Sequence, residues 1–94
     1  AFRYFKRMKN DFVESGFKGV FGIITRPNLQ QDPDRWAEVT SWLGDGIELA
    51  THTSYHSNLD NPKFKDEDYR AEIVDSAAMI TQQTGETVRT LITP

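Results

Sequence analysis

The chain has 94 residues, which is enough for one domain with a modest hydrophobic core. Its net charge is −3, and its acidic and basic residues are mixed along the chain without a basic stripe. We therefore expect no nucleic-acid partner. It has no cysteine, which excludes disulfides and thiolate metal ligands, and it has no apolar run long enough for a membrane span.

The first predicted element is an amphipathic helix over residues 2–15, ended by Gly16. Its apolar residues recur at steps of three and four, which predicts one buried stripe: Phe2, Phe5, Met8 and Phe12. Residues 19–25 follow as a continuous apolar run rich in β-branched and aromatic side chains. This run predicts a strand that is covered on both faces.

A second helix is predicted over residues 33–43. Asp32 can cap it by accepting a hydrogen bond from a backbone amide, and Pro33 has the fixed φ angle of a first helical residue. Trp36 lies on the apolar stripe, which favours a place in the core over stacking against a sugar. Trp42 lies off that stripe, and its role stays open between these two.

Two further strands are predicted over residues 46–52 and 87–93, on either side of a helix over residues 66–84. Asp66 is the expected cap of this helix, and Gly85 follows its end. The full order is helix, strand, helix, strand, helix, strand. It predicts an α/β fold with three parallel strands and three helices, joined by right-handed crossovers.

The candidate functional residues are His52 and His56, which lie four apart where the second strand ends. Imidazole is a common ligand of divalent metals, so the two rings could form half of a zinc site that carboxylates complete. They could also be ordinary loop residues, because a pair of histidines at this spacing also occurs without a metal.

The sequence around these histidines resembles the second motif region of the polysaccharide deacetylases, the superfamily that removes acetyl groups from chitin, peptidoglycan and xylan. The resemblance is specific at His52-Thr53-x-x-His56. It extends to other positions on both sides of this motif, namely Gly46, Glu48, Leu59, Glu72, Ile73, Thr84, Gly85 and Glu86.

This resemblance implies an interior slice of a distorted, incomplete (β/α) barrel, so residues 1–94 are expected to be one fragment of a catalytic domain. It implies that His52 and His56 bind a divalent metal ion, usually zinc. It also implies that the Thr53 hydroxyl supports the loop by hydrogen bonding. The implied partner is an acetylated polysaccharide, and the implied location is the cell envelope or the outside of the cell.

The family's catalytic aspartates and its acid histidine belong to motifs that we expect before Ala1 and after Pro94, so no catalytic residue is assigned. The family's next motif has an arginine where this chain has Ile92. Two alternatives follow from these departures. One is a descendant of the fold that binds carbohydrate without turnover, and the other is an unrelated small α/β interaction domain.

Overall fold

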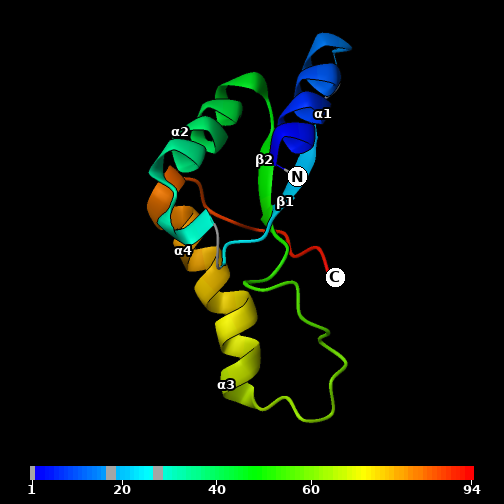
Figure 1. Ribbon diagram of the computed structural model, residues 1–94, viewed down its shortest axis with the longest axis vertical. Coiled ribbons are helices and arrows are strands. Elements are labelled where there is room, and N and C mark those ends of the chain that lie inside the picture. The colour runs from blue at the N-terminus through cyan, green and yellow to red at the C-terminus, as the bar shows by residue number, and fades with distance from the viewer. Residues whose placement is uncertain (1, 17–18, 27–28) are drawn as a thin grey trace.

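The computed structural model describes residues 2–16, 19–26 and 29–94, and it confirms the α/β class (Figure 1). Its elements, in chain order, are α1 (Phe2–Glu14), β1 (Val20–Ile23), η1 (Leu29–Gln31), α2 (Pro33–Ser41), η2 (Trp42–Asp45), β2 (Glu48–Thr51), α3 (Asp66–Tyr69), η3 (Arg70–Val74) and α4 (Asp75–Thr84). The last three form one helical run. The helices and the first two strands therefore lie close to their predicted positions.

The sheet has two strands, β1 and β2, which pair in parallel with Val20 opposite Glu48. The prediction of a third strand over residues 87–93 is wrong, because that segment forms only an isolated parallel bridge between Leu91 and Thr51. Two hydrogen bonds flank this bridge, at 3.0 and 2.9 Å. The ladder cannot extend toward the carboxyl side, since Thr53 turns into the left-handed region at φ 69°.

The core lies between one face of the sheet and the helices α2 and α4. It consists of Phe21, Ile23, Leu29, Trp36, Val39, Trp42, Ile47, Leu49 and Ile80. Both tryptophans are therefore packing residues, which removes sugar stacking as a role for Trp42. Alternate side chains along this segment face the opposite way: Val20 in β1 is 46% exposed, and Ile24, directly after β1, is 40% exposed. The prediction that this strand is covered on both faces is thus wrong for the described residues.

Helix α1 packs through its carboxyl-terminal half. Phe12 meets Phe21 edge-on, with ring centroids 5.9 Å apart. Lys9 is buried and donates to Asp45 at 3.1 Å, with its ammonium 5.7 Å from the centroid of the Trp42 ring. The prediction that the stripe is buried is wrong for Met8 and Phe12, which are both exposed. The side chains of Phe2 and Phe5 lie outside the described residues.

The helix ends follow from local hydrogen bonding. Asp32 caps α2 as predicted, because its carboxylate accepts from the Arg35 amide at 3.1 Å. Asp66 is instead the first residue of α3, and the preceding Lys65 amide donates to Asp68 Oδ2 at 2.8 Å. Gly85 ends α4 in the left-handed region at φ 79°. Within the described ranges, no helix combines the length and hydrophobicity needed to cross a membrane.

Candidate metal centre

His52 lies directly after β2, at the carboxyl ends of both strands. Its backbone amide donates to the Ile23 carbonyl at 2.9 Å, which continues the ladder between the strands by one residue. Because side chains alternate along a strand, His52 projects from the face opposite to that of Thr51. It lies against Gly22, where an added Cβ would be only 3.1 Å from the His52 Cβ. The lack of a side chain at position 22 therefore makes room for this histidine.

The orientation of the His52 ring is fixed by the last segment of the chain. Its Nδ1 lies 2.7 Å from the carbonyl oxygen of Ile92. A carbonyl can only accept, so Nδ1 carries the proton and donates. In the neutral ring, Nε2 then keeps a free lone pair for a metal ion. Metal-ligating histidines commonly have such a partner on their other nitrogen.

His56 lies next to His52, with the centroids of the two rings 4.7 Å apart and their planes at 66°. The chain between them must fold back sharply, and both Thr53 and His56 adopt positive φ angles of 69° and 59°. This conformation is uncommon for residues with a Cβ and above all for β-branched ones. The Thr53 hydroxyl accepts a hydrogen bond from the His56 amide at 3.0 Å, which closes this turn.

A buried set of hydroxyl groups attaches the beginning of the turn to α4. The Ser76 hydroxyl oxygen accepts from Thr51 at 2.7 Å and from Thr25 at 3.1 Å. Thr51 Oγ1 in turn accepts from the Thr53 amide at 3.1 Å. All four side chains are buried. The carboxyl ends of both strands are thus tied to the same helical residue.

The middle of the turn is held by η3. The Ser54 amide donates to the Glu72 carbonyl at 3.0 Å, and its hydroxyl donates to the Ala71 carbonyl at 2.7 Å. The Tyr55 amide donates to Glu72 Oε2 at 3.1 Å. Sequence reasoning placed Glu72 in the resembling region but gave it no contact. The sequence marked Glu72 only as a carboxylate within the helix predicted over residues 66–84.

Two histidines supply two ligands, and no group of three His, Cys, Asp or Glu side chains that could hold a metal occurs among residues 2–16, 19–26 and 29–94. Asp32 is engaged as the cap of α2 and in an ion pair with Arg35 at 3.3 Å. Asp60 lies in the loop after His56, and its amide donates to Asn58 Oδ1. The donor set fits half of a zinc site, because neutral imidazoles are typical zinc ligands.

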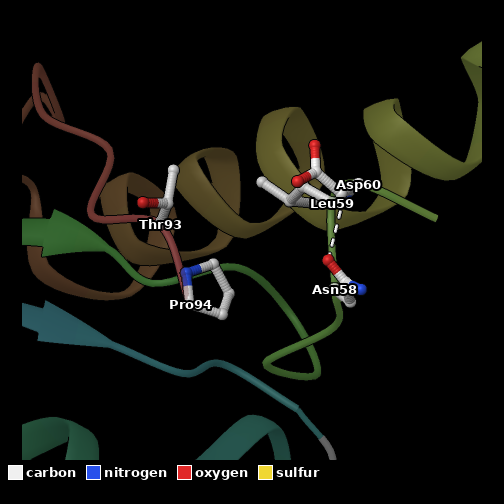
Figure 2. A pocket seen from close by; sticks show the side chains of 5 residues that line it. All are labelled: Asn58, Leu59, Asp60, Thr93 and Pro94. Carbon is white, nitrogen blue, oxygen red and sulfur yellow. Dashed lines mark hydrogen bonds between the residues drawn. The ribbon is translucent and has the colours of Figure 1, made fainter.

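A recess of about 220 Å³ lies beside the loop that follows His56 in the sequence. Figure 2 shows it between two stretches of chain, one following His56 and the other following Ile92. Its lining residues are Asn58, Leu59, Asp60, Thr93 and Pro94. The recess combines amide, carboxylate and hydroxyl groups with two apolar side chains. This mixture suits a polar ligand with hydroxyl groups.

A family model described as polysaccharide deacetylase matches residues 5–94. No curated protein and no solved structure matches the chain. The match covers nearly the whole sequence, including both histidines and the segment that contacts them.

Proposed function

The chain belongs to the polysaccharide deacetylase family, and on this premise we propose that it supplies the metal-binding part of a domain that removes acetyl groups from a polysaccharide with a divalent metal ion. Carbohydrate deacetylation is the activity of the family. Dependence on a metal and the status of residues 1–94 as an interior part of the domain are our proposals. Zinc is the proposed ion, because imidazole is one of its preferred ligands.

His52 and His56 are the residues proposed to hold the ion. The observation that carries this assignment is the hydrogen bond from His52 Nδ1 to the Ile92 carbonyl, together with the 4.7 Å separation of the two rings. The bond leaves Nε2 as the free nitrogen of His52. It also restricts the ring to one orientation, so the ligand is ready before an ion arrives.

A bound divalent ion would supply polarisation of the acetyl carbonyl and a lowered pKa of its bound water. The residues of this chain orient the two imidazoles, through the Ile92 carbonyl for one ring and the turn around Thr53 for the other. The recess lined by Asn58, Asp60 and Thr93 is the proposed place for the neighbouring sugar hydroxyls. The groups that accept and donate protons are expected in other parts of the domain.

Titration of zinc into the chain and into His52→Ala and His56→Ala tests the metal assignment. Calorimetry should show binding to the wild-type chain and a loss of affinity in both variants. Equal affinity in all three would refute it. Acetate release from chitooligosaccharide, acetylxylan and peptidoglycan fragments, measured with a chain extended at both ends, tests the reaction. We expect the same two substitutions to abolish that release.

A second candidate is binding of the polysaccharide without turnover. It is favoured by Ile92, which replaces the arginine of the family's next motif. In this case the extended chain would bind acetylated oligosaccharides but would release no acetate at any zinc concentration. Replacement of Ile92 by arginine would then be the first variant in which to look for recovered activity.

A further inference from the structure

The helical run from Asp66 to Thr84 widens at η3, beside the turn that carries the two histidines. There the Asp75 amide donates to the Arg70 carbonyl, five residues back, in place of the four-residue spacing of an α-helix. The widened stretch supplies two carbonyl groups, of Ala71 and Glu72, to Ser54 in the turn. Such widened stretches with five-residue hydrogen bonds inside an α-helix are often found at functional sites.

Glu72 adds its side chain to these contacts. It is only 4% exposed, and its Oε2 accepts from the Tyr55 amide at 3.1 Å. Its Oε1 is buried and has no hydrogen-bond partner among the described residues. Burial of a carboxylate with one oxygen unpartnered costs free energy, so this arrangement does not maximise stability.

The turn needs such anchors, because its backbone is unusual. Thr53 and His56 both have positive φ angles, and Ser54 and Tyr55, which lie between them, are the two residues that η3 holds. An unfavourable conformation persists only where the surrounding contacts impose it. Without the contacts to η3, the segment could relax, and His56 would leave its place beside His52.

We propose that Glu72 is a positioning residue of the metal centre: through the Tyr55 amide it holds the turn in the conformation that brings the His56 ring to the His52 ring. Among the described residues, it forms no hydrogen bond or ion pair with either histidine side chain. This inference rests on the proposed function, because the affinity it predicts is that for zinc.

The test compares Glu72→Gln and Glu72→Ala with Glu67→Gln, which removes the same charge from an exposed position on the same helical run. Zinc affinity is measured by calorimetry well below the unfolding temperature, and folding is checked by circular dichroism. We expect Glu72→Ala to raise the Kd for zinc about 10-fold, as for other residues that orient metal ligands. Glu72→Gln should raise it less, because an amide oxygen can still accept from Tyr55. Glu67→Gln should leave it unchanged.

Hydrogen exchange of the Tyr55 amide, followed by NMR without zinc, gives a reading that does not depend on metal. It should quicken in Glu72→Ala while the Leu49 and Ala50 amides of β2 keep their rates. Unchanged zinc affinity and unchanged Tyr55 exchange in a folded Glu72→Ala chain would overturn the inference. If Glu72→Ala does not fold, the same two measurements on Glu72→Ser decide, because the shorter side chain also removes the acceptor of the Tyr55 amide. Failure of the wild-type chain to bind zinc would instead refute the proposed function, and quickened Tyr55 exchange would then still support the control of the turn by Glu72.

Discussion

The Nδ1 atom of His52 and the carbonyl oxygen of Ile92 lie 2.7 Å apart, although the two residues are 40 positions apart in the sequence. The contact uses the backbone of Ile92, so any residue type at position 92 could provide it. The same residue donates its amide to the Thr51 carbonyl at 2.9 Å. The segment around Leu91 and Ile92 forms no third strand, but its backbone fixes the orientation of the His52 ring.

This contact predicts which nitrogen carries the proton in the uncharged His52 ring. We expect its Nδ1 to carry the proton and its Nε2 to be free, and we expect zinc to perturb the Nε2 resonance. Nitrogen-15 NMR of the imidazole rings checks both points. Binding should weaken as the solution is made more acidic, because a protonated imidazole cannot ligate zinc. A free ring protonated at Nε2 would contradict the prediction.

The close approach of Gly22 to His52 predicts that Gly22→Ala weakens zinc binding. The new methyl group would lie 3.1 Å from the His52 Cβ and 3.2 Å from the Ile92 Cδ1, so these neighbours must move by a few tenths of an ångström. The Ile92 methyl can rotate away, whereas the His52 Cβ is held by the strand. Calorimetry should show lower zinc affinity in a chain that still folds. Gly44→Ala is the control, because a Cβ there meets nothing within 4 Å.

Ser76→Ala should lower the free energy of unfolding by about 1–3 kcal/mol, because it leaves the buried hydroxyls of Thr25 and Thr51 without their shared acceptor. Urea unfolding measures the change. Ser41→Ala is the matched control, since Ser41 is exposed and its hydroxyl bonds only to the backbone of its own helix. A loss no larger than that of the control would contradict the role of Ser76.

The carboxylate of Glu38 is expected to stabilise the folded chain by an amount that depends on pH. The hydrogen bond from Trp42 Nε1 lowers the pKa of the Glu38 carboxyl; burial raises it, and the charges of Lys6 and Lys9 lower it further. Because the pKa is lower in the folded state, the stabilisation is complete above the ordinary carboxyl pKa. It is lost as the pH falls through the folded-state value.

Urea unfolding at a series of acidic pH values checks this dependence. Glu38→Gln should be less stable than the wild-type chain at neutral pH, and the difference should shrink on acidification. Glu67→Gln, which removes a charge from an exposed position, is the control. A difference that stays constant with pH would show that the Glu38 carboxylate does not act through its charge.

Asp60→Asn should leave the zinc affinity of the chain unchanged. Asp60 is the carboxylate nearest to His56 in the sequence, yet it belongs to no group of three candidate ligands among the described residues. It lines the recess instead, so oligosaccharide binding is the property that the substitution should reduce. A drop in zinc affinity would identify Asp60 as a third ligand.

Local sequence patterns predict the elements that depend on near neighbours. Helices form where apolar residues recur at helical spacing, and Asp32 caps its helix because an amide of its own first turn lies within reach. The parallel pairing of the first two strands follows from the helix that connects them. The position of His52 at the carboxyl end of a strand follows from the same local pattern.

How the ends of these elements meet depends on contacts between segments that are far apart in the sequence. The segment around Leu91 forms one bridge because Thr53 leaves the extended conformation, and that conformation depends on contacts to η3. Trp42 is buried because Phe21 and Lys9, both more than 20 residues away, pack on it. The Ile92 carbonyl at His52 and the Glu72 carboxylate at Tyr55 are likewise long-range contacts. Local spacing cannot specify such contacts, because they form only when distant segments are brought together by the burial of a common core.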